Sequence, residues 1–267
     1  MLIARRRDQS RYPQAWDELA AAWYPGAGPS GTRLYDLSGR DNHCVLTNGP
    51  TWVDGLGGKA ISYDGVNDYG TCGSSPNLNF ERTDKFSGST WVNHGVINAD
   101  DVLFSRRQVS DDRGYVFYIT SGNRIELVLQ SSNGNRIRRA GSTNILANIW
   151  YHVAFSYDGT SLASGVRLYV NGVRETETSP QDNLTTTMQA TGQFELGNQT
   201  INPLLLTGQL ADTLIHSRVL PADEFKLLAQ RPGIAFEPKP RVFYSIPASV
   251  KAWLFRRQSQ IIGGGLG

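Results

Sequence analysis

Short β-type runs separated by turn residues dominate the sequence between residues 20 and 220. Three of these runs follow closely on one another: "YVFYIT" at 115–120, "RIELVLQ" at 124–130 and "NRIRRA" at 135–140. The joining segments "SGN" and "SSNG" are typical of hairpins, because Gly and Asn adopt the backbone angles that tight turns require. This spacing of turn residues between β-type runs predicts an antiparallel β-sheet rather than a helical bundle.

A second pair of strands and one helix complete the pattern. "WYHVAFSYDGT" at 150–160 and "GVRLYVNGV" at 165–173 read as paired strands, and "NG" at 171–172 opens a tight turn. "PADEFKLLAQ" at 221–230 begins with Pro, carries acids in its first turn and aligns Phe225, Leu228 and Ala229 on one side. One helix on many strands predicts an all-β, two-sheet antiparallel sandwich.

The chain reads as one domain with two basic arms. It has 267 residues and 28 glycines, a size and composition that suit a single turn-rich β domain. The proline-rich "RPGIAFEPKP" marks the end of the body near residue 231. We therefore divide the chain into a basic N-terminal arm (1–14), the body (15–230) and a proline-rich, basic C-terminal arm (231–267).

The arms and the body have opposite charge. Residues 1–14 carry +3 and residues 231–267 carry +5, which leaves −6 on the body of a chain whose net charge is +2. Basic arms of this kind contact an acidic protein surface or nucleic acid, or simply keep the chain ends solvated. We expect protein partners and a homo-oligomer, and nucleic acid is the less favoured partner. The predicted assembly contacts are Arg5, Arg6, Arg7, Arg11, Phe243, Tyr244, Trp253, Phe255, Arg256 and Arg257.

The sequence carries few targeting signals that bear on where the protein works. No apolar run approaches the roughly 18 residues of a membrane span, and the charged start lacks the apolar stretch of a secretory signal peptide. We therefore expect synthesis in the cytoplasm and no membrane partner.

The two cysteines, Cys44 and Cys72, cannot form a disulfide framework or a zinc site by their spacing. We expect two free, buried thiols, although the sequence does not decide whether they pair.

The order of motifs resembles one family over residues 16–230. "LYDLSGRDNHCVLTNGPTWVDGLGGKAISYDGVNDYG", "WYHVAFSYDGT", "VRLYVNGV", "FELGN" and "LTGQLADTLIHSRVLPADEFKLL" occur in the order typical of laminin-G-like, concanavalin A-like lectin/glucanase domains. The branch it resembles is common in bacterial and phage proteins. The flanking "PQAWDELAAAWYPG" and "AFEPKPRVFYSIPAS" are similar to phage-encoded members. The resemblance implies a jelly roll of two antiparallel sheets.

The stretch "DLSGRDNHC" at 36–44 crowds chemically active residue types together, but we interpret it as a turn. In the family this segment enters an early strand, where Asp36 and Ser38 can bond backbone N–H groups. His43 and Cys44 are adjacent, so on a strand they point to opposite faces and cannot act as base and thiol.

Other catalytic sites are not indicated. Glycoside hydrolases of this fold usually carry "E-x-D-x-x-E" on one strand, and this string is absent. The adjacent acids Asp100–Asp101 and Asp111–Asp112 read as charged loop ends. The histidines, at 43, 94, 152 and 216, show no metal-binding spacing. His152 matches a buried family position. We predict that the chain is not an enzyme.

Calcium is the one cofactor that the resemblance suggests. Relatives often hold calcium with clustered loop oxygens, and the candidate ligands here are Asp36, Asp64 and Asp212. In the motif "GQLADTLIHSRVL" the family's steadier acid is replaced by Ala211. We therefore do not expect calcium to bind, and for Asp64 we favour a turn with Asp68 around Gly65.

A lectin site would need a loop rim or sheet face with polar and aromatic groups. Trp52, Trp91 and Trp150 are assigned to core packing. Asn98, Arg107 and Asn183 are candidates for a rim, without a basis for choosing among them. Arg136 and Arg138 share one face of their strand, and we expect that face to be solvated.

Two functional hypotheses follow, and they are compatible. The first is a non-enzymatic virion structural protein of a bacteriophage, a capsid decoration, fibre or tail component, that displays the jelly roll and is anchored to other virion proteins by both arms. The alternative is a carbohydrate-binding adhesion module for cell-surface glycans. A glycoside hydrolase is a distant third.

Overall fold

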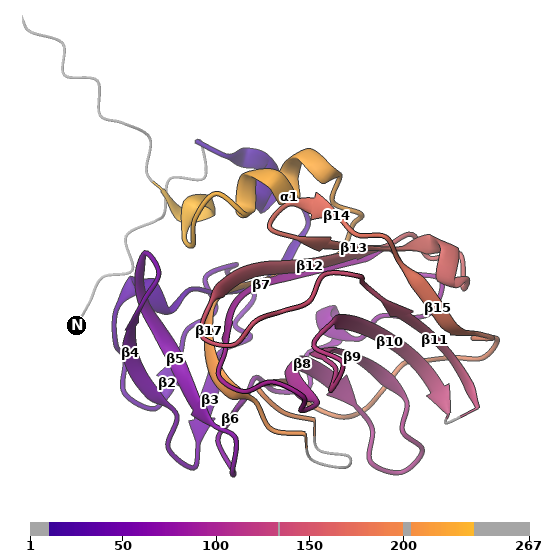
Figure 1. Cartoon of the computed structure of the whole chain (residues 1–267), viewed down its shortest axis with the longest axis horizontal. Helices are drawn as coiled ribbons and strands as arrows, with labels where there is room; N and C mark the ends of the chain where they lie inside the picture. Colours follow the sequence, from indigo (N-terminus) through magenta and orange to yellow (C-terminus); the bar gives the residue numbers. More distant parts are fainter. Residues whose placement is uncertain (1–10, 133, 200–203, 238–267) are drawn as a thin grey trace, which may run out of the picture.

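Residues 11–132, 134–199 and 204–237 of the chain are described by a computed structural model, and they form two antiparallel sheets packed face to face (Figure 1). The first sheet has eight strands, seven of them in the spatial order β14-β13-β12-β7-β17-β5-β4, with β1 pairing beside β5 on β17. Their bounds are Val173–Arg174 (β14), Val166–Val170 (β13), Trp150–Tyr157 (β12), Phe86–His94 (β7), Thr207–His216 (β17), Gly58–Asp64 (β5), Thr51–Gly55 (β4) and Leu19–Trp23 (β1).

The second sheet has nine strands in the order β15-β11-β10-β9-β8-β16-β6-β3-β2. Their bounds are Thr178–Asp182 (β15), Asn135–Ala140 (β11), Ile125–Ser132 (β10), Gly114–Ile119 (β9), Asp101–Arg107 (β8), Phe194–Leu196 (β16), Tyr69–Thr71 (β6), Cys44–Thr47 (β3) and Arg33–Leu34 (β2). The consecutive strands β8 to β11 form a meander of hairpins, so the predicted strands at 115–120, 124–130 and 135–140 are confirmed.

Aromatic side chains fill the space between the sheets. Phe117 of β9 and Phe104 of β8 lie 5.5 Å apart between ring centroids, and Phe117 lies 5.2 Å from Phe155 of the opposite sheet. All three rings are fully buried. Burial of one such ring stabilises the fold by about 1.5–3 kcal/mol, so this aromatic layer holds the two sheets together.

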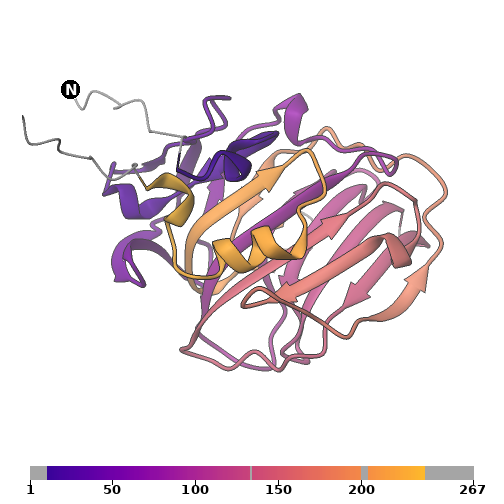
Figure 2. The same ribbon diagram turned by 90° about the horizontal axis from the view of Figure 1, so that it is seen from above.

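A short helix, α1 (Ala222–Leu228), covers the outer face of the eight-stranded sheet (Figure 2). Phe225 and Leu228 pack there against Ala154, Tyr169 and other outward-facing residues. The prediction of a single late helix is confirmed in its position, and no helix among residues 11–132, 134–199 and 204–237 is long and apolar enough to cross a membrane.

The described residues next to both predicted boundaries of the body pack on this same outer face. Trp16, in the 3₁₀ turn Pro13–Trp16, donates a hydrogen bond from Nε1 to Ala235 O at 2.9 Å and meets Phe236 edge-on. The second 3₁₀ turn, Ile234–Phe236, is buried, and Arg11 forms an ion pair with Glu237 at 2.6 Å. The packed body therefore reaches beyond residue 231 as far as the structure describes it. Three further 3₁₀ turns lie at Pro25–Ala27, Pro76–Leu78 and Ala163–Gly165.

The expectation of two free thiols is wrong, because Cys44 and Cys72 form a disulfide. β3 and β6 are neighbouring antiparallel strands in which Val45 pairs with Thr71, so that Cys44 and Cys72 lie opposite each other. Both cysteines are buried in the core. A separation of 28 residues along the sequence gives no sign of this pairing.

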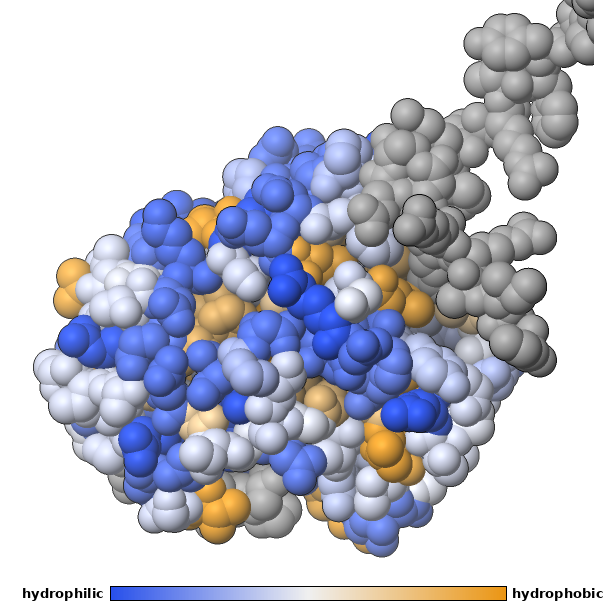
Figure 3. Space-filling view, turned by 180° about the vertical axis from the view of Figure 1, so that it is seen from behind, coloured by the Kyte–Doolittle hydropathy of each residue, from blue (hydrophilic) through white to orange (hydrophobic). Residues whose placement is uncertain are grey.

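The face shown in Figure 3 is mainly hydrophilic, and its apolar side chains form small, separate patches. The most exposed large apolar residues of the described chain, such as Val66, Val109 and Val173, are likewise scattered along the sequence. Isolated apolar residues of this kind are normal on a water-exposed surface.

Candidate functional site

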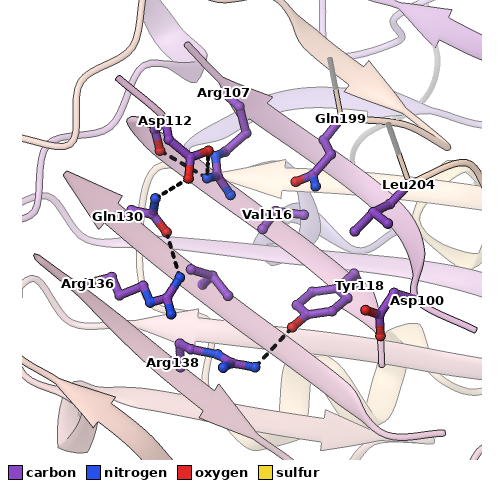
Figure 4. A pocket seen from close by; sticks show the side chains of 11 residues that line it. Asp100, Arg107, Asp112, Val116, Tyr118, Gln130, Arg136, Arg138, Gln199 and Leu204 are labelled. Carbon is purple, nitrogen blue, oxygen red and sulfur yellow. Dashed lines mark hydrogen bonds and ion pairs between the residues drawn. The ribbon is translucent and has the colours of Figure 1, made fainter. Parts of the chain in front are cut away.

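A hollow of about 310 Å³ lies on the outward face of the nine-stranded sheet, across β8 to β11 (Figure 4). This volume is at the lower end of the range for small-ligand sites. Side chains from these four strands line the hollow, together with Asp112 from the β8–β9 connection and Gln199 and Leu204 from the segment before β17.

Strand alternation sorts the residues of β9 between the core and the hollow. Tyr115 and Phe117 point into the main core, whereas Val116 and Tyr118 belong to a small separate cluster on the other face. Val116 pairs directly with Val128 of β10, and both valines are almost completely buried. These two valines make an apolar floor.

Gly114 leaves room at one end of this floor. The cross-strand row there reads Arg107, Gly114, Gln130 and Arg136, so the second position of the row has no side chain. Gly114 has φ +123°, and a Cβ placed on it would lie 1.9 Å from Arg106 O. The backbone therefore admits only glycine at this position, and the gap in the row is built into the fold.

The polar side chains at this end form one hydrogen-bonded chain across the strands. Arg107 Nη2 donates to Asp112 O at 3.0 Å and forms an ion pair with the Asp112 carboxylate. Gln130 Nε2 donates to the other carboxylate oxygen, Oδ2, and Arg136 Nη1 donates to Gln130 Oε1 at 3.5 Å. These bonds hold the donors in place around the gap that Gly114 leaves.

Arg107 is the most buried cation of the hollow, with a side chain only 6% exposed. Burial lowers the pKa of its guanidinium, and the neighbouring Asp112 opposes this shift. The group keeps its charge at neutral pH. Its hydrogen bonds run through Nη2 alone, and no described residue provides an acceptor for Nε. This Nε is enclosed by protein atoms.

The other end of the hollow is built around Glu126. Tyr118 Oη donates to Glu126 Oε1 at 2.9 Å, and Arg138 Nε donates to the same oxygen at 2.5 Å. Burial, and then the charge of Glu126, raise the pKa of Tyr118, so its phenol stays neutral. Asp100 lies beyond Tyr118 in Figure 4, and its carboxylate accepts a hydrogen bond from Ser121 N.

The sequence that forms this two-sheet sandwich matches one family of known proteins. The family described as the concanavalin A-like lectin/glucanases superfamily matches residues 64–226, more than half of the chain. The chain belongs to this superfamily. The predicted fold class, an antiparallel two-sheet sandwich with one short helix near its end, is thereby confirmed. No curated protein matches the sequence.

Solved structures with this superfamily fold include several toxin binding domains. The binding domain of Paraclostridial Mosquitocidal Protein 1 has a TM-score of 0.64 at 18% identity, over 81% of this chain and 52% of that chain. The ligand-binding domain of botulinum neurotoxin serotype D, in complex with N-acetylneuraminic acid, has a TM-score of 0.61 at 14% identity, over 82% and 52%.

A third structure is Trypanosoma rangeli sialidase in complex with sialic acid, with a TM-score of 0.58 at 11% identity, over 79% of this chain and 32% of that chain. Our chain thus spans about half or less of the length of these three proteins. Identity at these levels shows a shared fold.

Sequence reasoning found the hollow of this superfamily domain only in part. Arg107 was one of three rim candidates and does line the hollow, although it lies on a strand and is buried. Asn98 and Asn183 are exposed and lie outside the lining. Arg136 and Arg138 were assigned to a solvated face, but they line the hollow and are only partly exposed.

The adjacent acids are not simply charged loop ends. Asp101 is buried at the start of β8 and is hydrogen-bonded to the buried His94. Asp112 lines the hollow, whereas Asp111 forms an ion pair with Arg113 nearby. Strand register decides these differences, and it cannot be read from a pair of adjacent aspartates.

The residues do not fit the calcium site that the resemblance implies. Both Asp36 oxygens accept hydrogen bonds, Oδ1 from Ala22 N and Ser38 N and Oδ2 from Asn42 N and Ser38 Oγ. This is the turn interpreted from the sequence. In the described chain, no group of three or more His, Cys, Asp or Glu residues could hold a metal ion.

The other two candidate ligands also have structural partners. Asp64 Oδ1 accepts a hydrogen bond from Val66 N, which lowers the pKa of its carboxyl, as expected of a turn residue. Asp212 occupies a bulge in β17 with φ +51°, and its Oδ2 accepts from Gly233 N at 2.8 Å. Asp212 thus anchors the 3₁₀ turn Ile234–Phe236 to the sheet.

The histidines and tryptophans lie mostly in packed positions. His43 Nδ1 accepts from Asp36 N at 3.0 Å, so it bonds the turn and not the neighbouring disulfide cysteine. His152 is buried as predicted, and burial lowers its pKa to about 3. Trp91 is buried against His152, while Trp52 and Trp150 are partly exposed and pack on core clusters.

Of the predicted assembly contacts, Arg11 is described, and it pairs with Glu237 within the chain. The other nine lie outside the described residues: Arg5, Arg6, Arg7, Phe243, Tyr244, Trp253, Phe255, Arg256 and Arg257.

Proposed function

We propose that this chain is a carbohydrate-binding module that binds a glycan in the hollow on the outward face of the nine-stranded sheet. The observation that carries the proposal is the pairing of an apolar floor, Val116 and Val128, with fixed polar groups around it. A sugar ring has an apolar C–H face and a polar edge, and this lining is complementary to both.

The comparisons support glycan binding in general, but they do not identify the residues of this chain that would bind the glycan. Membership of a lectin/glucanase superfamily agrees with glycan binding. Two structures of similar fold hold N-acetylneuraminic acid or sialic acid. The buried disulfide agrees with work in an oxidising environment, where disulfides persist and cell-surface glycans are displayed.

We propose further that binding occurs without cleavage. Glycoside hydrolysis requires one carboxyl that gives up a proton and a second that acts as base or nucleophile. Asp112 is held in an ion pair with Arg107, and Glu126 accepts hydrogen bonds from Tyr118 and Arg138. Both carboxylates are therefore already engaged by side chains of the hollow itself.

A glycan array probed with the full chain tests the binding proposal. Substitution Val128→Phe places a ring on the floor of the hollow, and we expect it to abolish binding to the glycans that the wild type retains. Val173→Phe is the matched control, because Val173 lies 67% exposed on β14 of the other sheet. Equal binding by wild type and Val128→Phe would place the glycan elsewhere.

The virion role and the homo-oligomer remain proposals that rest on the basic arms. Mass spectrometry of intact virions tests the first directly, since a decoration, fibre or tail protein must copurify with the particle. A virion role is compatible with glycan binding, because an adhesion module is useful on the outside of a particle that attaches to cells.

A further inference from the structure

Helix α1 covers only part of the outer face of the eight-stranded sheet (Figure 2), and a row of uncharged side chains crosses another part. Direct cross-strand pairing joins the members of this row, which are Thr51 of β4, Ser62 of β5, Gln209 of β17, Asn93 of β7 and Trp150 of β12. Their sequence neighbours Ile61, Leu210 and Val92 belong to the main core, so alternation turns the row outward. Five strands spaced about 4.8 Å apart make the row about 19 Å long.

The indole of Trp150 is held in place at one end of the row. It packs against a small cluster formed by Ala60, Trp91 and Ala211. Gly55, at the end of β4, lies so close that a Cβ on it would be 3.2 Å from Trp150 Cζ2. The Trp150 side chain is still partly exposed. A fixed, partly exposed indole offers an aromatic surface that loses little conformational freedom when a ligand binds.

The polar groups beside this indole have no hydrogen-bond partners in the part of the chain that the structure describes. This holds for the Trp150 indole N–H and for the side-chain amides of Asn93 and Gln209. Only the Asn93 oxygen among these groups is enclosed by protein atoms, so Asn93 Nδ2, Trp150 Nε1 and the Gln209 amide reach the surface. The charges at the neighbouring hairpin cancel, because Asp54 pairs with Lys59 at 2.5 Å.

We infer that this row is a second glycan site, which binds a neutral, extended oligosaccharide with one sugar ring stacked on Trp150 and further hydroxyls bonded to Asn93 and Gln209. A sugar ring has C–H groups on its faces and hydroxyls at its edge, which match an indole followed by amides. An uncharged row offers no attraction to an acidic sugar or to the basic arm of a neighbouring copy. The site lies on the other sheet from the hollow, so this inference goes beyond the proposed function.

NMR titration of the ¹⁵N-labelled full chain tests the inference. The probes are cellotetraose, maltotetraose, laminaritetraose and tetra-N-acetylchitotetraose, each added to about 10 mM, which fills a site with a millimolar Kd. We expect at least one probe to shift the indole N–H signal of Trp150 and the side-chain NH₂ signals of Asn93 and Gln209, because these donors gain an acceptor. Unchanged signals with all four sugars would overturn the inference.

Two variants and a control locate the binding. Trp150→Ala removes the aromatic surface, and we expect the Kd to rise at least about 10-fold. Gln209→Ala removes a partly exposed amide without a partner in the described chain, so we expect an intact fold and a Kd about 3- to 10-fold higher. Tyr35→Ala is the control, because Tyr35 is 47% exposed beside β2 of the other sheet, and we expect an unchanged Kd. Circular dichroism checks that each variant folds.

The substitution Val128→Phe, which fills the hollow, separates this inference from the proposed function. We expect binding at the row to survive it. A neutral sugar whose binding is lost in Val128→Phe but kept in Trp150→Ala and Gln209→Ala overturns the inference and supports the hollow as the site. Binding that needs Trp150 and Gln209, with no glycan bound in the hollow, supports the inference and overturns the proposed function.

Discussion

At the scale of single residues, Gly114 determines the shape of the hollow. Its positive φ and the 1.9 Å that would separate a Cβ from Arg106 O allow no other residue without a backbone shift. We expect Gly114→Ala to destabilise the fold by about 2 kcal/mol or more, as overpacking and strain add. Urea denaturation measures this, with Gly134→Ala as control, because a Cβ on Gly134 meets nothing within 4 Å.

Two buried histidines make stability depend on pH. Burial lowers the pKa of His152 to about 3 and that of His216 to about 4, both below the unfolded value of 6.5. Between pH 6.5 and pH 4 both histidines therefore bind protons in the unfolded chain but not in the folded chain. The free energy of unfolding keeps the whole contribution of these histidines above pH 6.5 and falls as the pH falls.

The expected slope of this loss is about 1.4 kcal/mol per pH unit for each histidine. Denaturation curves between pH 7 and pH 4.5 check it, and His152→Gln removes one contributor and lowers the slope by about half. A slope unchanged by His152→Gln would mean that other groups control the acid limit.

At the scale of elements, the disulfide joins two neighbouring strands, β3 and β6, across a loop of 28 residues. Closing a loop of this length restricts the unfolded chain and stabilises the fold by about 3–4 kcal/mol. We expect the double variant Cys44→Ala, Cys72→Ala to lose about this much in free energy of unfolding, measured by urea denaturation. Loss of less than about 1 kcal/mol would show that packing alone holds these strands together.

The sequence predicted the long elements well because their signals are local. β9, β10 and β11 follow alternation and turn residues, and α1 follows its proline and its apolar side. Short strands such as β2 and β16 are paired by residues far away in the chain, so no local pattern reveals them. The same is true of the Cys44–Cys72 bond.

The site was harder to predict than the fold. Alternation shows that Arg136 and Arg138 share a face, but it does not say which face or what lies opposite. That depends on Gly114 and Gln130 entering the same cross-strand row, and on Asp112 turning back over Arg107. The sequence signal that could have located the hollow is the combination of Gly114 with arginines at the ends of adjacent hairpin strands.

At the scale of the whole molecule, helix α1 and the described segments 12–16 and 234–236 pack on the eight-stranded sheet, while the hollow lies on the far side of the nine-stranded sheet. The two outer faces can therefore serve separate purposes: one close to the predicted arms and the other for a ligand. This arrangement suits a module that is held on one side and presents its site on the other.

The predicted homo-oligomer is tested in the full chain. We expect charge reversal of two arm residues, Arg256→Glu with Arg257→Glu, to convert an oligomer into a monomer, because the basic arm is expected to contact the acidic body of a neighbour. Sedimentation velocity measures the change. A wild type that sediments as a monomer at all accessible concentrations would remove this prediction.

The central claim is that the outward face of the nine-stranded sheet binds glycan. Amide chemical-shift mapping by NMR, with the tightest-binding glycan added to the ¹⁵N-labelled full chain, tests it most directly. The account predicts shifts concentrated on Arg107, Gly114, Val116, Val128 and Arg136. Shifts confined to other surfaces, with these amides unmoved at saturation, would contradict it.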